Sequence, residues 1–127
     1  MDTTTCSRLL REEFPEQTAE FDDPIWVGLL HLEVSVLARL AENAIDRRDY
    51  HTLQRCYDFV TRAVSEGDAA VKNAMSVSFL ENILLVAETP EQQEAEQRLP
   101  EGLRRDLAEL RRRWERLAVE AQKHEGQ

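Results

Sequence analysis

The chain has 127 residues, of which 32% are charged, and its formal net charge is −9 at pH 7. This excess of acid argues against nucleic acid as the main partner and against an anionic membrane surface, because both require a basic footprint on the protein. The length is typical of one domain with its own hydrophobic core, and the low content of glycine and proline, four of each, favours helices.

The two cysteines, Cys6 and Cys56, form no CxxC pair and have no histidine clustered near them. This arrangement is typical of reduced thiols in a cytosolic protein. The first residues lack the apolar segment of a secretion signal, and no apolar run reaches the roughly 18 residues that a membrane span needs. We therefore expect a cytoplasmic protein that has no membrane contact.

Residues 1–23 form an acidic N-terminal arm, with two arginines against seven acidic residues. Leu9, Leu10 and Phe14 are spaced as one face of a short helix that Pro15 limits. Two interpretations stay open: the arm docks through these three residues, or it attracts a basic partner. The acidic residues expected to contact such a partner are Glu12, Glu13, Glu16, Glu20, Asp22 and Asp23.

A first long helix is predicted from Pro24 to about Asp46, because Asp23 is a good N-cap and proline fits the first helical position. Gly28 inside this helix is interpreted as the mark of a close helix crossing. The core residues expected in it are Ile25, Trp26, Leu29, Leu30, Leu32, Val36, Leu37, Leu40, Ala41, Ala44 and Ile45.

A second helix is predicted to begin after Asp49, which is placed to cap it, and to end at Gly67 as the usual C-terminal glycine. Its apolar residues repeat at intervals of three and four, which indicates one buried face. These residues are Tyr50, Leu53, Cys56, Tyr57, Val60 and Val64.

The stretch from Val71 to Ala87 is the longest one that is almost free of charge, and the chain is expected to pack around it. Asp68 is its predicted N-cap, and the residues before Pro90 end it. The wide apolar face expected to be buried consists of Met75, Val77, Phe79, Leu80, Ile83, Leu84, Val86 and Ala87.

Glu81 is the only acidic residue between Asp68 and Glu88, and it has two interpretations. It either sits at a solvent gap or pairs with an arginine of a neighbouring helix, or it recognises a partner together with Ser78 and Asn82.

Residues 89–100 are rich in glutamate and form either a solvated linker or a short helix that a capping box at Thr89 and Gln92 would start. The last helix should run from about Glu101 to about Lys123. Its apolar residues follow a four-three spacing, which is typical of a bundle helix but also of a coiled-coil dimer seam. They are Leu103, Leu107, Leu110, Trp114, Leu117 and Ala121.

Motifs for catalysis, cofactors and metals are missing from the sequence. The three histidines, His31, His51 and His124, lie far apart in the sequence. His31 is two residues from Glu33, so these two do not form the HExxH motif of a zinc-binding helix. We therefore expect no catalytic residue, no cofactor and no metal site.

The segment from Val71 to Leu84, with its VKNAMSVSFLE core, resembles a small all-helical bacterial domain family of uncharacterised function. Some members of that type resemble immunity proteins found with polymorphic toxins. The resemblance implies a bound protein partner and no activity, and it transfers no binding residue.

We therefore predict an all-α protein, a single domain over residues 1–127, built as a bundle of roughly four to five helices or as stacked helical hairpins. The leading hypothesis is a non-enzymatic immunity-type protein that occludes a basic toxin or effector. The alternative is a scaffold domain that forms a homodimer through Leu103, Leu107, Leu110, Trp114 and Leu117.

Overall fold

The computed structural model describes residues 1–25 and 27–125, with side chains to residue 123, and this part of the chain is all-α. Joining α5, η2 and α6 into one helix leaves seven helices in the described residues, besides the short 3-10 turn η1, which is a few more than expected. The elements are α1 (Thr3–Glu13), η1 (Pro15–Gln17), α2 (Thr18–Phe21), α3 (Leu30–Arg47), α4 (Tyr50–Glu66), α5 (Ala69–Met75), η2 (Ser76–Leu80), α6 (Glu81–Leu84), α7 (Pro90–Gln97) and α8 (Glu101–Glu125).

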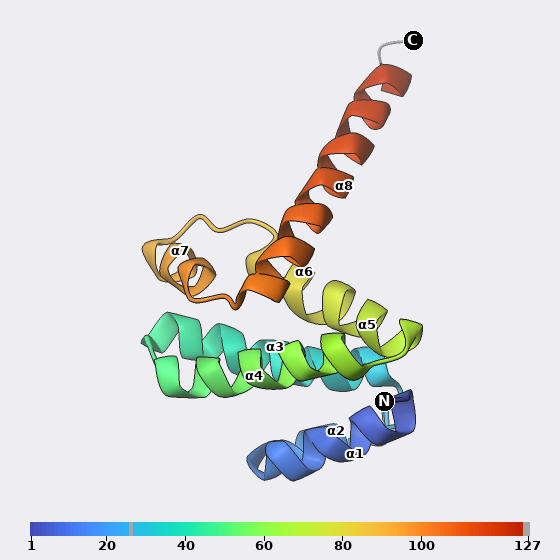
Figure 1. Cartoon of the computed structure of the whole chain (residues 1–127), viewed down its shortest axis with the longest axis vertical. Helices are drawn as coiled ribbons and strands as arrows, with labels where there is room; N and C mark the ends of the chain where they lie inside the picture. Colours follow the sequence, from blue (N-terminus) through green and yellow to red (C-terminus); the bar gives the residue numbers. More distant parts are fainter. Residues whose placement is uncertain (26, 126–127) are drawn as a thin grey trace.

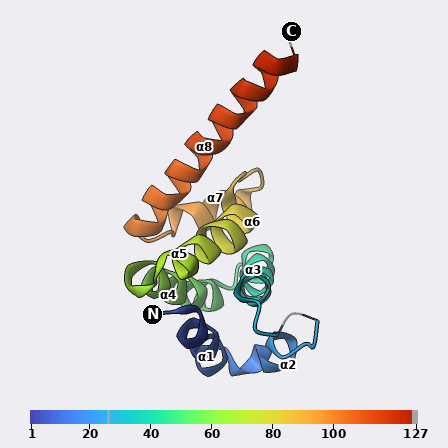
Figure 2. The ribbon, with the colours of Figure 1, turned by 90° about the vertical axis from the view of Figure 1, so that its right-hand side faces the viewer.

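The helices lie in three layers around the hairpin of α3 and α4 (Figures 1 and 2). Helices α1 and α2 cover one side of this hairpin, while α5, α6, α7 and the start of α8 cover the other. Helix α3 contacts elements of both outer layers, including α1, α2, η2, α6 and α7. The molecule is therefore organised around α3 rather than around the uncharged stretch alone.

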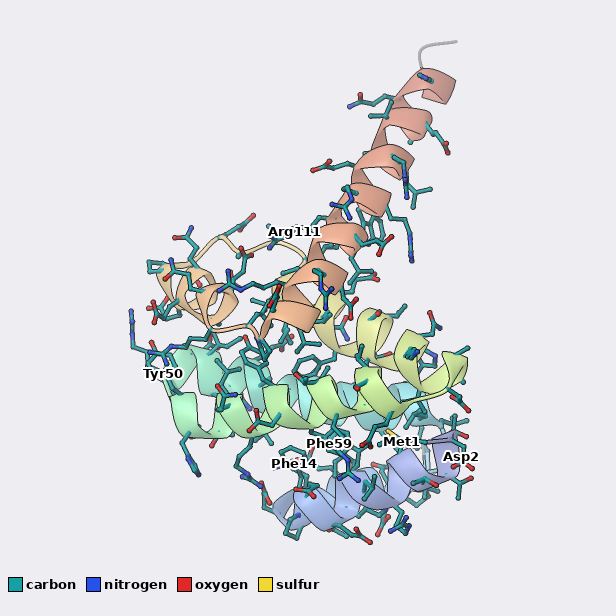
Figure 3. All side chains as sticks on the ribbon, in the orientation of Figure 1. Met1, Asp2, Phe14, Tyr50, Phe59 and Arg111 are labelled. Atoms are coloured by element: carbon teal, nitrogen blue, oxygen red, sulfur yellow. The ribbon has the colours of Figure 1, made fainter. Side chains whose placement is uncertain are left out.

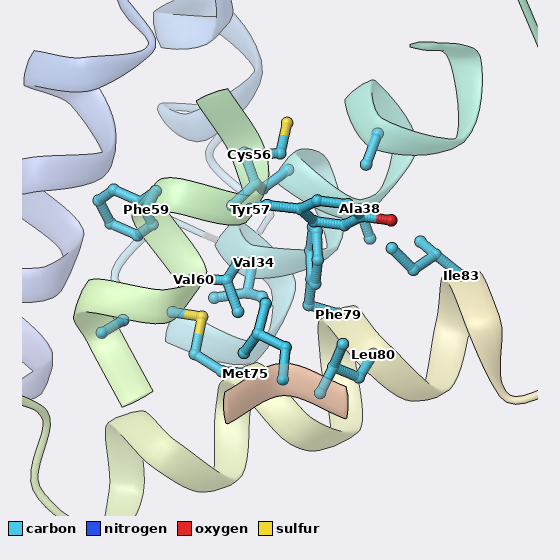
Figure 4. Close-up of a cluster of buried hydrophobic side chains, with 14 of the residues drawn as sticks. Val34, Ala38, Cys56, Tyr57, Phe59, Val60, Met75, Phe79, Leu80 and Ile83 are labelled. Atoms are coloured by element: carbon cyan, nitrogen blue, oxygen red, sulfur yellow. The ribbon is translucent and has the colours of Figure 1, made fainter. Parts of the chain in front are cut away.

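The core lies where α3, α4 and the α5–α6 helix meet (Figure 4). Four side chains are fully buried there: Val34 of α3, Val60 of α4, Met75 of α5 and Phe79 of η2. Tyr57 is buried with them, and its hydroxyl donates to the carbonyl of Ala95 at 2.8 Å, which ties α7 to α4.

The N-terminal residues form a packed layer, in which Leu9, Leu10 and Phe14 are buried. The rings of Phe14 and Phe59 meet edge to face with centroids 5.8 Å apart (Figure 3). Arg11 binds the fully buried carboxylate of Glu33 at 2.8 Å. Because a buried charge is costly without a partner, this pair fixes α1 on α3.

Helix α3 begins at Leu30, so the predicted start at Pro24 is wrong. Asp23 instead makes a local turn, in which its side chain accepts from the backbone N–H of Ile25 at 2.9 Å. Gly28 then adopts φ +81, which breaks the right-handed helical path. Ile25 and Leu29 are consequently 78% and 53% exposed instead of buried, and the expected core residue at position 26 lies outside the described residues.

Helix α4 begins as predicted, with the Asp49 side chain accepting from the N–H of Thr52. The predicted end at Gly67 is confirmed, and this residue follows the last helical residue with an extended backbone, its φ and ψ being −74° and 153°. A β-carbon there would lie 2.3 Å from the carbonyl oxygen of Ala63 and 2.6 Å from Cγ1 of Val71. Glycine therefore allows the close approach of α4 and α5.

The central helix begins at its predicted cap, Asp68, but η2 interrupts it with a π-helical turn. Val77, which lies in this turn, and Val86, which lies beyond the end of the helix, are 37% and 61% exposed, contrary to the expected buried face. The helix ends at Leu84, before the predicted Ala87. Arg111 of α8 donates to the carbonyls of Leu84 and Leu85, at 2.7 and 3.1 Å, and thereby caps this end.

Helix α7 carries the capping box of Thr89 and Gln92, and α8 begins at the predicted Glu101. The first half of α8 packs on the body, and its second half projects away from it (Figure 1).

Cys6 and Cys56 are free and buried, as expected for reduced thiols.

Candidate partner-binding groove between α3 and α6

The π turn η2 sets the geometry of the surface between α3 and α6. The N–H of Glu81 bonds to the carbonyl of Ser76, five residues back, which is the bonding of a π turn. Such a turn leaves a carbonyl without its usual backbone donor, and the side-chain amide of Asn82 donates to the carbonyl of Ser78 at 2.9 Å. Asn82 is thereby held at the edge of α6 that faces α3.

A second contact ties this turn to the start of α3. The ring Nδ1 of His31 lies 2.8 Å from the hydroxyl oxygen of Ser78, and the two form a hydrogen bond. Ser78 is 6% exposed and is one of the two buried polar side chains in the described part of the chain. The bond therefore satisfies a group that burial would otherwise penalise, and it connects the start of α3 to the π turn.

Two adjoining pockets form a groove along α3, and both are lined by Glu42 and Asn82. We call them together the α3–α6 groove. The first pocket has a volume of about 290 Å³ and is lined by Glu42, Ile45, Asp46, Asn82, Ile83 and Gln92. The second has about 270 Å³ and is lined by Leu32, Ser35, Ala38, Arg39, Glu42 and Asn82.

The first pocket is acidic at its rim and apolar at its base. Ile45 and Ile83 are 3% and 4% exposed and form the base. Glu42 and Asp46 are four residues apart on one helix face, where like charges repel each other. Partial burial and the charge of Asp46 raise the pKa of Glu42 above its usual value.

Arg39, which lines the second pocket together with Glu42, has a charge that partly offsets the rise in the pKa of Glu42. Within the described side chains, neither Glu42 nor Asp46 takes part in an ion pair. With two carboxylates, two amides and an apolar base, the pocket has the chemistry to hold a lysine or arginine side chain and its aliphatic stem.

The six acidic residues predicted from the N-terminal arm lie in the opposite layer, on α1, η1, α2 and the turn after it. Four of them are in ion pairs, Glu12 with Arg8, Glu16 with Arg55, Glu20 with Arg39 and Asp22 with Arg11. Asp23 accepts from the N–H of Ile25, while Glu13 is exposed. The arm therefore presents less free negative charge than its composition indicates.

The three residues predicted on the central helix separate in the structure. Ser78 and Asn82 are joined by a hydrogen bond, and Asn82 lines the α3–α6 groove. Glu81 is partly exposed and does not line either pocket of the groove. Within the described residues, Glu81 forms no ion pair with an arginine.

The predicted dimer seam on α8 divides at Arg111. Leu103, Leu107 and Leu110 are 1%, 2% and 4% exposed and belong to the core of the chain itself. Trp114 and Leu117 are 45% and 50% exposed. Only these last two residues of the predicted seam are available to a second copy.

Sequence reasoning did not identify Glu42, Asp46 or Gln92 as candidate site residues. The spacing of Glu42 and Asp46 on a helix was visible, but it is common on exposed helix faces. Their importance comes from Asn82 and Ile83, which lie nearby only because α6 packs beside α3.

The described residues contain no group of three or more histidine, cysteine, aspartate or glutamate side chains that could hold a metal ion. Among the described helices, none combines the length and apolar character of a membrane span.

Comparison with known proteins gives one family. No curated protein and no solved structure shows a significant match to the chain. Residues 7–115 match the family described as Domain of unknown function (DUF7674), and this range includes both sides of the α3–α6 groove. Because the match covers most of the chain, the protein belongs to the DUF7674 family.

Proposed function

We propose that the protein is a non-enzymatic binding domain of the immunity type, which captures a basic toxin or effector and covers its active site. The observation that supports this most directly is the unpaired carboxylate pair of Glu42 and Asp46 above an apolar base. A basic side chain of the partner would neutralise both charges and remove their repulsion. Binding would thus release a cost that the free protein carries.

The surroundings of the pocket agree with a protein partner. Next to the pocket, Leu32 is 42% exposed and lines the adjoining half of the groove. An apolar residue beside a charged pocket is a common arrangement in protein interfaces, where an anchoring side chain is surrounded by apolar contact. The net charge of −9 adds long-range attraction for a basic partner, which raises the association rate and weakens as salt increases.

The test is capture of basic proteins from a lysate of the source organism, followed by binding measurements with each purified candidate. The double variant Glu42→Gln, Asp46→Asn should weaken binding by at least about tenfold, because two charges at the anchor are lost. A matched control is Glu12→Gln, Glu16→Gln, which removes the same charge from the N-terminal layer. The control should change the association rate slightly and leave the dissociation rate unchanged.

The immunity role needs a second measurement. The captured protein is expressed in cells with and without the chain, and growth is followed. Restored growth with the wild-type chain, and its loss with the groove variant, is the expected result. Equal binding by the groove variant would contradict the groove as the contact surface, while tight binding without restored growth would contradict the immunity role.

A further inference from the structure

The outer half of α8 stands apart from the rest of the molecule (Figures 1 and 3). Among the side chains of α8 described up to residue 123, Arg111 is the last that bonds to the body, through the carbonyls of Leu84 and Leu85 and the side chain of Glu96. Every residue from 112 to 123 is exposed. We call residues 112–123 the free arm.

The free arm continues the buried face of α8 without a partner. Trp114, Leu117 and Ala121 follow Leu107 and Leu110 at the same four-three spacing, so they lie on the same side of the helix. Trp114 is 45% exposed and Leu117 is 50% exposed. An isolated helix of this length is marginal in water, and an apolar stripe of this kind is typically buried by another helix.

We propose that the free arms of two copies of this chain pair with each other in an antiparallel orientation. The charges along one edge of the apolar stripe favour a second copy of the chain as the partner. Arg113 and Glu120 are two turns apart on that edge. A two-fold axis between residues 116 and 117 places Arg113 of each copy beside Glu120 of the other, so the arm is complementary to itself.

The apolar residues fit the same arrangement. Around this axis Leu117 meets Leu117 of the second copy near the centre, and Trp114 lies over Ala118 and Ala121 of the second copy. A large residue opposite small ones is the pairing that fills an antiparallel helix interface.

A parallel pair lacks both advantages. It would put Arg113 beside Ala118 of the second copy, where no opposite charge is present. It would also bring the two bodies together at one end. Since most of the 25 acidic residues of the chain lie outside the free arm, the bodies repel each other, and the antiparallel pair keeps them at opposite ends.

The experiment is sedimentation velocity of the full chain over a wide range of concentration, together with variants of the free arm. The wild-type chain should form a dimer, and Leu117→Glu should be a monomer. Val119→Glu is the matched control, because Val119 is also 51% exposed but lies on the opposite side of the arm; this variant should remain a dimer. Circular dichroism verifies that all variants keep the wild-type helix content.

A charge exchange tests the orientation. Arg113→Glu alone, or Glu120→Arg alone, should weaken the dimer at least about tenfold, because each places like charges together twice. The double variant Arg113→Glu, Glu120→Arg should restore it. A wild-type monomer at all concentrations, equal loss in Val119→Glu and Leu117→Glu, or failure of the double variant to recover would each overturn the proposal. Because the α3–α6 groove is not part of the arm, these outcomes are independent of the partner-binding function.

Discussion

At the scale of single residues, Glu42 shows how a partly buried carboxylate beside a second acid can reduce stability. Burial, and then the charge of Asp46, raises the pKa of Glu42 in the folded protein above its usual value of 4.5. The folded state therefore binds the proton more tightly than the unfolded state, so the ionised carboxylate costs stability above the folded pKa. This cost decreases as the pH falls through the folded pKa and is absent below the unfolded value.

Glu42→Gln should accordingly raise the free energy of unfolding at pH 7 by about 0.5 kcal/mol, the size of a like-charge pair on an exposed helix face. The gain should vanish below about pH 4, where the carboxyl is protonated in both states. Urea unfolding at several pH values measures it. Glu12→Gln is a control of opposite sign, because it removes the exposed pair with Arg8; a Glu42→Gln variant less stable than wild type at pH 7 would refute the explanation.

The two cysteines offer a second residue-scale prediction. Burial raises the pKa of Cys6 to about 11 and that of Cys56 to about 12. Because only the thiolate reacts, both thiols should react with a thiol reagent at pH 8 at least about a hundredfold more slowly in the folded protein than in urea. Absorbance of the released chromophore measures the rates. A fast phase from one thiol in the native protein would show that its helix opens locally.

At the scale of elements, Gly67 lies between α4 and α5 at a position that has no space for a β-carbon. Gly67→Ala should lower the free energy of unfolding by about 2 kcal/mol or more, since the new methyl group would overlap the carbonyl of Ala63 and the side chain of Val71. Gly102→Ala is the matched control: a β-carbon there has no atom within 4 Å, and the change should add up to about 1 kcal/mol. Thermal unfolding of both variants measures the difference, and a similar effect at both positions would contradict the contact.

The helix ends show how far local chemistry predicts the fold. The starts at Asp49, Asp68 and Thr89 were predictable because each cap satisfies backbone groups of its own helix. The start of α3 was not, because Asp23 and Pro24 look equally suitable for a turn or a helix. The positive φ of Gly28 selects the turn over the helix, and this backbone angle cannot be read from the sequence.

At the scale of the whole molecule, the fold class and the buried faces of α4 and of the first half of α8 were predictable from apolar spacing. The α3–α6 groove was not, because it depends on the π turn and on which helices become neighbours. Equally, the spacing of Leu107, Leu110, Trp114 and Leu117 is uniform. Only the position of the other helices determines that the first two are buried and the last two are exposed.

This division of α8 gives a prediction for the complete molecule. If the free arm contributes no packing to the body, a chain that ends at Arg112 should unfold at the same temperature as the full chain, provided that both are measured below the concentration at which arms pair. The reason is that Leu103, Leu107, Leu110 and Arg111 remain, and these residues make the buried and capping contacts of α8.

Circular dichroism measures this comparison at 222 nm, a wavelength that reports helix content. As the concentration increases, the full chain should gain thermal stability through association, while the shortened chain should not, because binding to the folded state alone stabilises it by mass action. A lower unfolding temperature of the shortened chain at high dilution would instead mean that the free arm folds back on the body. In that case the apolar stripe of Trp114 and Leu117 would serve the fold, and the solvent-exposed arm of Figure 1 would be one of two arrangements of α8.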